Sequence, residues 1–346
     1  MPAFPIRKLT AMTHALLILS GLAVSPALAA TVEVYLRAEA TTISMPDGAI
    51  IPMWGFAQDS GFGVGDGTIS IPGPQINAAA GDTLIIHLDN NLPVPVSIVI
   101  PSQITAMTPV FLPDPDGTGR PRVQSFTHET PPGNGAAVDY TWTNLKAGTF
   151  LYESGTHPAV QIQMGLYGAA IVDSGVAGQA YGETSSAYDV QLTMLFSELD
   201  PALHAAVDDG TYVSFGNLGD PGVSMTSTVD YNPKYFLING EAYSGSTAPI
   251  AAGAVGDRVL LRLLNAGLRS RAPFVVRSRQ SLIAEDGNEY AHVKDQAVVR
   301  LPAGQTKDSI VEFTTDGDYA FFDRAMGVTN AGASPGGMFR ILQVAP

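Results

Sequence analysis

The chain has 346 residues, contains no cysteine and carries a net charge of −14 at pH 7. A chain of this length is expected to form two domains and to bury enough apolar surface to need no disulfide bridge. The large negative charge would repel nucleic-acid phosphates and anionic lipid surfaces, so binding to nucleic acids and to membrane surfaces is disfavoured.

The segment at 1–29 has the pattern of an export signal. Arg7 and Lys8 form a basic segment, residues 15–24 form an apolar segment too short to span a bilayer, and Ala27-Leu28-Ala29 is typical of a cleavage site. Its removal changes the net charge from −14 to −16, because two basic residues and no acidic residue are lost. No later apolar run reaches the roughly 20 residues of a membrane helix. We therefore expect a periplasmic or secreted protein without membrane insertion.

Short runs of alternating apolar and polar residues follow, separated by many of the 36 glycines and 25 prolines. This spacing is typical of an all-β chain with frequent turns. One short helix is expected near residue 201, because Asp200 can cap it, Pro201 suits its first position and Gly210 lies just beyond its end. In chain order, the clearest elements are strands at 32–36, 83–88, 139–143 and 190–195, the helix at 201–207, and strands at 258–264 and 309–313.

The two halves of the chain repeat one pattern in the same order. The segments at 74–92 and 249–268 share a proline, a Gly-Asp pair, an alternating strand and an asparagine. Later in each half, GTFLYES at 148–154 matches GDYAFFD at 317–323. Because the same order of segments occurs twice, two β-sandwich domains of one design are expected.

The domain limits follow from this repeat and from composition. We predict a signal peptide at 1–29, a first domain at 31–175 and a second domain at 189–346. A segment rich in Ser, Gly and Ala at 176–188 is the predicted linker.

The repeated segments, together with PDGAIIPMWGFAQD at 46–59 and SFTHETPPGNG at 125–135, resemble the multicopper oxidase superfamily in its two-domain, exported form. The resemblance covers nearly the whole mature chain. It implies two tandem cupredoxin-like Greek-key β-sandwich domains, a blue copper centre, a trinuclear copper cluster and oxidoreductase activity. It also implies, by analogy, a homo-oligomer.

The residues that such copper sites need are missing. A blue copper centre uses a Cys thiolate, two His and a weak axial Met, and this chain has no Cys. The resemblance implies a trinuclear cluster held by His-x-His pairs, whereas the chain has six His and no His-x-His. The positions that the resemblance assigns to lost ligands are Val99, Pro101, Glu153, Gly155, Arg271 and the triplet Asp323-Arg324-Ala325, while Met338 stays near the axial position. We therefore predict that type 1 and trinuclear copper are absent.

Two histidines lie near these positions. His157 follows shortly after Gly155, and His128 lies in the stretch 125–135. One interpretation is that both imidazoles hydrogen-bond backbone groups in Gly/Pro loops. The alternative is a residual mononuclear copper site formed by His157, His128, Glu153 and Met164. No cofactor is predicted on the first interpretation, and copper on the second.

The remaining polar candidates are expected at the surface. His87 lies on the outward face of its strand and corresponds in the repeat to Arg262, so both are predicted to be exposed. His204, on the predicted helix, and His292 are expected to be solvated.

Three functions follow from these observations. The first is a non-catalytic binding or scaffold module, the second is a copper-binding protein with an atypical His/Met site, and the third is an oxidoreductase with copper supplied at a subunit interface. The missing ligands favour the first function, with a protein partner of unknown identity. The candidate contact segment is 101–122, which carries Met107, Val110, Phe111 and Leu112, and an inter-domain lid is its alternative role.

Overall fold

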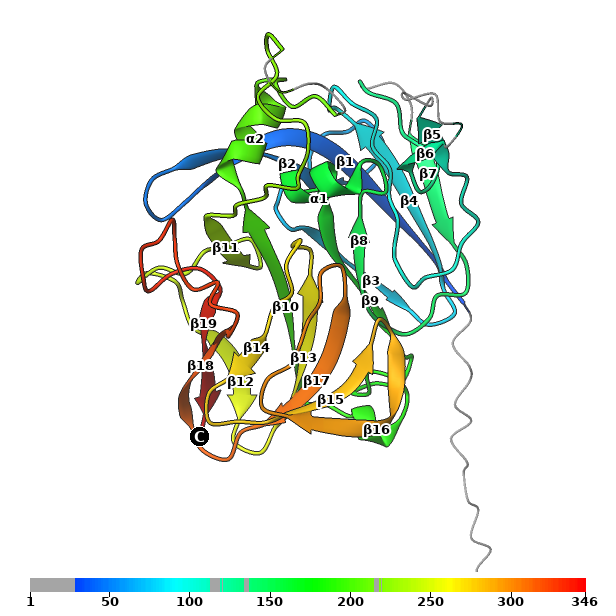
Figure 1. Cartoon of the computed structure of the whole chain (residues 1–346). Coiled ribbons are helices and arrows are strands. Elements are labelled where there is room, and N and C mark those ends of the chain that lie inside the picture. Colours follow the sequence, from blue (N-terminus) through cyan, green and yellow to red (C-terminus); the bar gives the residue numbers. More distant parts are fainter. Residues whose placement is uncertain (1–28, 113–118, 120, 134–136, 215–217, 219) are drawn as a thin grey trace, which may run out of the picture.

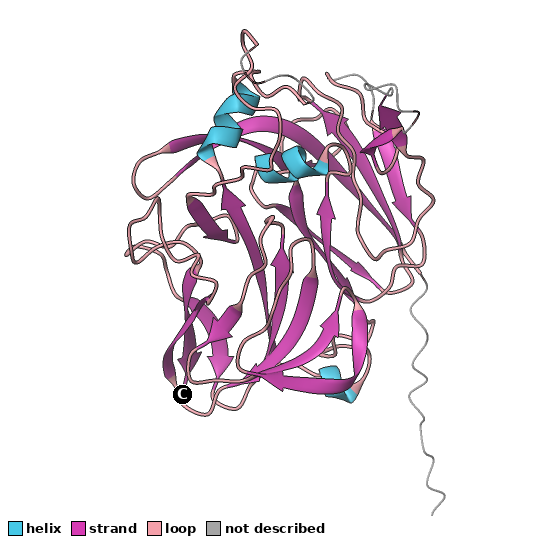
Figure 2. Cartoon of the chain, in the orientation of Figure 1, coloured by secondary structure: helices cyan, strands magenta, loops and turns pink. Residues whose placement is uncertain are grey.

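The computed structural model describes residues 29–112, 119, 121–133, 137–214, 218 and 220–346. In this part of the chain, strands dominate, and the helices are α1 (Pro158–Met164), α2 (Pro201–Asp208) and the single turn η1 (Thr184–Ser186) (Figures 1 and 2). The all-β prediction is confirmed, and so is the short helix, which Asp200 caps by accepting the N–H of Ala202 at 3.0 Å. The predicted signal peptide lies outside the described residues except for Ala29.

The first half of the chain forms two sheets and a small hairpin. One sheet has the order β2-β1-β4-β7, the second has the order β3-β9-β8, and β5 pairs with β6. The strands are β1 (Thr31–Ser44), β2 (Ile50–Asp59), β3 (Gly73–Ala79), β4 (Thr83–Asn90), β5 (Val110–Leu112), β6 (Arg122–Ser125), β7 (Val138–Trp142), β8 (Gly148–Glu153) and β9 (Tyr167–Asp173).

The second half repeats this arrangement with longer sheets. One sheet has the order β11-β10-β13-β17-β15-β16 and the other β12-β19-β18-β14. The strands are β10 (Val190–Leu199), β11 (Tyr235–Ile238), β12 (Ile250–Ala254), β13 (Arg258–Asn265), β14 (Pro273–Val275), β15 (Gln280–Glu285), β16 (Asn288–Gln296), β17 (Thr306–Glu312), β18 (Gly317–Asp323) and β19 (Phe339–Ala345).

The strand pairing confirms the internal repeat. In the first half, β1 runs parallel to β4 and β3 runs parallel to β9; in the second half, β10 runs parallel to β13 and β12 runs parallel to β19. The asparagine of the repeat has the same role in both halves. Asn90 donates to the carbonyls of Val94, Thr130 and Pro131, and Asn265 donates to those of Arg269, Leu301 and Pro302. The repeated asparagine therefore holds the loop that follows each central strand.

The two halves pack against each other through an apolar interface. Leu151 and Ile171 from the first half contact Leu195 and Leu264 from the second half, in one buried cluster. Figure 1 shows β8 and β9 beside β10, β13 and β17 at this junction. The outward face of β13 is therefore covered by protein.

Arg262 lies on this covered face, so the prediction that it is exposed is wrong. The side chain is fully buried, and its Nη1 donates to the Thr149 hydroxyl at 2.9 Å and lies 3.9 Å from the Asp308 carboxylate. The hydroxyl of Thr149 in turn donates to Asp308 at 2.6 Å. Its counterpart in the first half, His87, retains some exposure and binds Asp139 at 2.7 Å. The alternation of apolar and polar residues along β13 correctly predicts the face on which Arg262 lies. However, the first domain, and not water, covers that face.

The prediction that His204 is solvated is also wrong. The helix α2 follows β10 but packs on β2 of the first domain, where Nδ1 of His204 donates to the Pro52 carbonyl at 2.7 Å. The imidazole is fully buried, and this burial lowers its pKa to about 4. No helix among the described residues is long and apolar enough to cross a membrane.

We predict that His204 makes stability fall in acid. Its folded-state pKa of about 4 lies below the unfolded value of 6.5, so the unfolded chain binds a proton first as pH falls. The neutral imidazole of His204 contributes its full stabilisation above pH 6.5, and this contribution is lost as pH falls to about 4. The free energy of unfolding should decrease by about 3 kcal/mol over this range. His204→Asn keeps a donor for Pro52 but does not titrate, and urea unfolding of this variant should show a flatter acid limb. The exposed His292→Asn serves as the control, and equal acid limbs in both variants would contradict the prediction.

We also predict that Arg262 stabilises the domain junction. Arg262→Met leaves the Asp308 carboxylate buried without its cation and should lower the free energy of unfolding by about 3–5 kcal/mol. Arg279→Ala removes an exposed ion pair with Asp295 and should cost about 0–1 kcal/mol. Chemical denaturation of both variants measures the difference, and similar small losses would overturn the assignment.

Candidate functional site

A buried ionic cluster occupies the second domain where the resemblance places copper ligands. Arg271 precedes β14, Asp323 ends β18, and Met338 precedes β19. Nη1 of Arg271 donates to Oδ2 of Asp323 at 3.2 Å, and the N–H of Asp323 donates to the Met338 carbonyl at 3.1 Å. A Cβ atom at Gly327 would lie within 3.2 Å of side-chain atoms of all three residues. Their side chains are therefore gathered at one end of the second sandwich.

Glu198, at the end of β10, completes the cluster. Its Oε2 forms an ion pair with Nη2 of Arg271, and its Oε1 accepts the N–H groups of Leu268 and Arg269 at 3.1 Å each. We name Glu198, Arg271 and Asp323 the charge triad; their exposures are 1%, 3% and 0%. Burial lowers the pKa of Arg271, and the Asp323 carboxylate opposes that shift. Sequence reasoning did not select Glu198, because a single acid at a strand end carries no distinctive signal.

In the structure, Asp323 and not Arg324 takes the inward, cysteine-like position of the expected ligand triplet. The sequence interpretation puts Arg324 at the central, cysteine-like position of Asp323-Arg324-Ala325. However, β18 ends at Asp323, whose side chain points inward, and both following residues are exposed. Asp323 also accepts the N–H groups of Ala272 and Ala325 at 2.8 and 2.9 Å. Asp323 is therefore the residue of the triplet that lies beside Arg271 and Met338.

The same position in the first domain is uncharged. Val96 pairs with Thr130 through two backbone hydrogen bonds, as Arg271 pairs with Leu301. Ser154 donates its N–H to the Leu166 carbonyl at 3.0 Å, as Asp323 donates to Met338. The equivalent side chains are thus Val96, Ser154 and Leu166. All three are buried, and the Ser154 hydroxyl donates to Oε1 of Gln161 at 2.6 Å.

Three other substituted positions of the first domain, Val99, Glu153 and Gly155, lie next to one another. Val99 and Glu153 exchange two backbone hydrogen bonds of 2.9 Å each. A Cβ atom at Gly155 would lie 2.8 Å from a methyl group of Val99, so Val99 fills the space that a side chain at 155 would need. Glu153 is partly buried, and this burial raises its pKa to about 7.

His128 is engaged by its surroundings. Its ring stacks on Tyr140 with centroids 4.4 Å apart and planes 9° from parallel. Nε2 donates to the Asp139 carbonyl at 3.0 Å, and Nδ1 lies 3.2 Å from the Thr127 hydroxyl. Both ring nitrogens are therefore within hydrogen-bonding distance of a loop or strand group.

His157 has a different environment. Its backbone adopts the left-handed conformation (φ 41°, ψ 54°) directly before α1. Its ring lines a cavity of about 290 Å³ and makes no hydrogen bond to a described residue. Partial burial lowers the pKa of this imidazole, and Glu129 opposes the shift.

The remaining member of the hypothetical residual site, Met164, is fully buried at the end of α1. Within the described part of the chain, no three His, Cys, Asp or Glu residues are grouped so that they could hold a metal ion. The residual site of His157, His128, Glu153 and Met164 stays a prediction.

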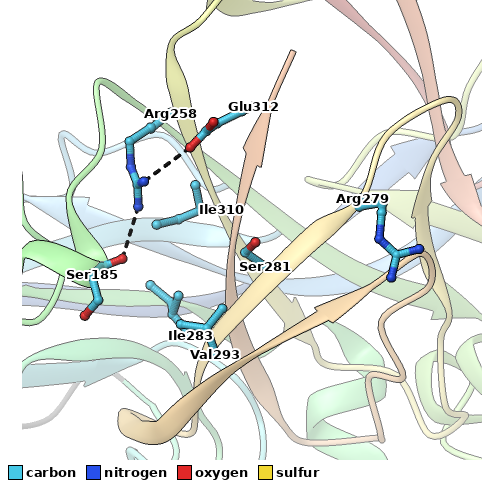
Figure 3. A pocket seen from close by; sticks show the side chains of 8 residues that line it. All are labelled: Ser185, Arg258, Arg279, Ser281, Ile283, Val293, Ile310 and Glu312. Carbon is cyan, nitrogen blue, oxygen red and sulfur yellow. Dashed lines mark hydrogen bonds and ion pairs between the residues drawn. The ribbon is translucent and has the colours of Figure 1, made fainter. Parts of the chain in front are cut away.

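A larger cavity of about 430 Å³ lies on the second domain (Figure 3). Its charged groups already have partners. Arg258 binds Glu312 at 3.2 Å and the Ser185 carbonyl at 3.1 Å, and Arg279 binds Asp295 at 2.6 Å. These arginines are therefore committed to contacts within the chain.

The predicted contact segment is partly exposed. Met107 and Phe111 are exposed, whereas Val110 and Leu112 are half-buried. The hairpin of β5 and β6 lies at the end of the first domain that is distant from the second domain (Figure 1). Residues 113–118 and 120 of this segment lie outside the described residues.

Comparisons with known proteins agree with this architecture. Two family models, both described as multicopper oxidase, match residues 68–176 and 220–343. A comparison with curated protein sequences found no match.

Solved structures similar to the chain include the blue copper oxidase from Nitrosomonas europaea, which is 18% identical with a TM-score of 0.68 over 91% of this chain and 86% of that one. The multicopper oxidase mgLAC is 21% identical with a TM-score of 0.67 over 91% and 86%. The copper nitrite reductase from Nitrosomonas europaea is 20% identical with a TM-score of 0.63 over 91% and 94%. The fold is thus two tandem cupredoxin-like domains, as expected.

We predict that the charge triad acts as one unit in stability. Arg271→Met leaves two buried carboxylates without their cation and should lower the free energy of unfolding by about 3–5 kcal/mol. The triple variant Glu198→Gln, Arg271→Met and Asp323→Asn carries no buried charge and should regain a large part of that loss. Urea unfolding of the single and triple variants provides the comparison. A triple variant no more stable than Arg271→Met would contradict the prediction.

Proposed function

We propose that this chain, which belongs to the multicopper oxidase family, is an exported, non-catalytic binding module of that family. Its second domain has the charge triad at the place where a blue copper centre needs its cysteine. The observation that carries this proposal is the guanidinium of Arg271 between Glu198 and Asp323. A guanidinium has no acceptor atom and keeps its charge, so it cannot serve as a metal ligand.

The residues at the copper positions do not fit the metal. In the second domain, the Asp323 carboxylate is already bonded to Arg271 and to backbone N–H groups. In the first domain, Val96 and Leu166 are apolar, and the Ser154 hydroxyl is a weak ligand for copper compared with thiolate or imidazole. Met338 supplies one thioether sulfur in the second domain, but neither position supplies the thiolate and the two imidazoles of a blue copper centre.

The proposed location is the periplasm or the exterior, and its support is the sequence pattern of the segment at 1–29.

For a protein partner, the support is the surface near β5 and β6, where Ile104, Met107 and Phe111 are 92%, 50% and 51% exposed. These three residues lie within eight positions of the sequence, and contiguous exposed apolar patches are typical of contact surfaces. A homo-oligomer rests on family analogy.

The second candidate function is copper binding at an atypical site, with or without oxidoreductase activity. It is favoured by the imidazole of His157, which makes no hydrogen bond to a described residue and lies at a cavity. His128 supports it less, because its ring nitrogens already face Asp139 and Thr127.

Copper retention decides between the two functions. The mature chain is loaded with Cu(II), passed through a desalting column and analysed for metal per chain, for visible absorption and for oxidation of phenols by oxygen. We expect no stoichiometric copper, no blue absorption and no turnover. Retention of one copper per chain that is lost in His157→Asn would overturn the proposal in favour of the second function. His292→Asn, at an exposed position, controls for non-specific binding to histidine.

A further inference from the structure

The cavity beside His157 is built by segments from both halves of the chain. Trp54 lies on β2, Val160 on α1 and Val207 on α2, and Tyr212 follows α2. We name it the α1–α2 cavity. Figure 1 shows both helices over β2, next to each other at the end of the first domain. The cavity exists because α2, which follows the first strand of the second domain, crosses back onto the first.

Three close contacts hold these walls in place. A Cβ atom at Gly165 would lie 2.0 Å from the Trp54 carbonyl, so only glycine lets the end of α1 approach β2 this closely. On the other side, His204 fastens α2 to Pro52 of the same strand at 2.7 Å. The N–H of Tyr212 donates to the Ala206 carbonyl at 2.8 Å, which places Tyr212 against the end of α2. The cavity is therefore formed before any ligand arrives.

The chemistry of the walls indicates what the cavity accepts. Trp54, Val160, Val207 and Tyr212 are apolar or aromatic, and no Asp, Glu, Lys or Arg is among the described residues that line the cavity. Since these walls offer no fixed charge to compensate an ion, a neutral ligand is favoured. The aromatic residues favour a planar ring, which can stack against them.

Apart from the hydroxyls of Tyr212 and the exposed Ser214, the polar side chains that set the chemistry of the wall are those of Gln161 and His157. The side chain of Gln161 is used internally, because it accepts from Ser154 and donates to the Pro95 carbonyl at 2.8 Å. The ring of His157, in contrast, makes no hydrogen bond to a described residue. It is held in a backbone conformation that costs energy for a residue other than glycine, and such strain is concentrated at functional sites.

We propose that the α1–α2 cavity binds a small, neutral, bicyclic aromatic molecule that donates one hydrogen bond to His157. The size follows from the volume of about 290 Å³, since an apolar cavity of about 150 Å³ accommodates a single benzene ring. This inference rests on the proposed function, because an imidazole that holds copper is not free to accept from an organic ligand.

Indole and 1-methylindole form the matched pair of probes, because they share the bicyclic ring and only indole has an N–H donor. Binding to the metal-free mature chain, in the presence of a chelator, is followed by calorimetry and by saturation-transfer NMR. We expect indole to bind with a Kd on the order of 0.1 mM, and 1-methylindole to bind about fivefold more weakly.

Two variants place the site. Val207→Trp fills the α1–α2 cavity and should abolish binding of indole, whereas Val293→Trp makes the same substitution at the larger cavity of Figure 3 and should leave it unchanged. His157→Asn keeps a residue that tolerates the left-handed backbone but removes the imidazole. In that variant, indole and 1-methylindole should bind equally weakly. This readout keeps the test valid if circular dichroism shows that Val207→Trp does not fold.

Absence of saturable indole binding, or unchanged binding in folded Val207→Trp, would overturn the inference. Equal affinity of both probes for the unaltered chain would overturn the role of His157. These outcomes are independent of the copper measurement. If the chain retains no copper and binds no indole, only this inference is contradicted. If it retains stoichiometric copper, the proposed function is contradicted.

Discussion

A guanidinium in a protein interior must be surrounded by acceptors, and this requirement shapes the second domain. Arg271 draws Glu198 from β10 and Asp323 from β18 to one point, and those carboxylates also bind the backbone N–H groups of the loops between strands. Because Met338 is hydrogen-bonded through its backbone to Asp323, the start of β19 is fixed as well. Charge pairing thus joins Arg271 and Asp323, which lie at positions that the resemblance assigns to copper ligands, to β10 through Glu198.

The same requirement acts at the junction between domains. Arg262 is buried there with Thr149 and Asp308, and one hydroxyl links the cation to the carboxylate. Burial raises the pKa of Asp308, and the Arg262 charge opposes that shift. An apolar interface alone would allow the two sandwiches to slide, whereas a buried ion pair has one favourable register. The relative position of the two halves, and with it the α1–α2 cavity, therefore depends on polar contacts at their centre.

Much of the architecture could be predicted from the sequence. The segment of Gly-Asp, alternating strand and Asn occurs once in each half, and the strand that follows Gly-Asp has the same pairing in both halves. The faces of individual strands were also predictable, yet alternation does not tell whether a face meets water or another domain, and so Arg262 was assigned to the surface. His204 was assigned there because the local sequence does not show that α2 packs on β2. The triplet at 323–325 was placed one residue too late, although the match of 148–154 with 317–323 already sets Asp323 opposite Ser154. Glu198 could not be selected, because its partner Arg271 is distant in the sequence and only the folded sheet brings the two together.

The crossing of α2 has a consequence for how such chains can change in evolution. The composition of residues 176–188 suggests a place where domains could be exchanged between genes, but α2 lies beyond it and is fastened to Pro52 of the first domain. An exchange at that point would replace the helix that packs on β2 and remove the Val207 side of the cavity beside Trp54. A boundary after Tyr212 would instead separate β10 from β11 and β13, so the two halves are tied together on both sides of α2.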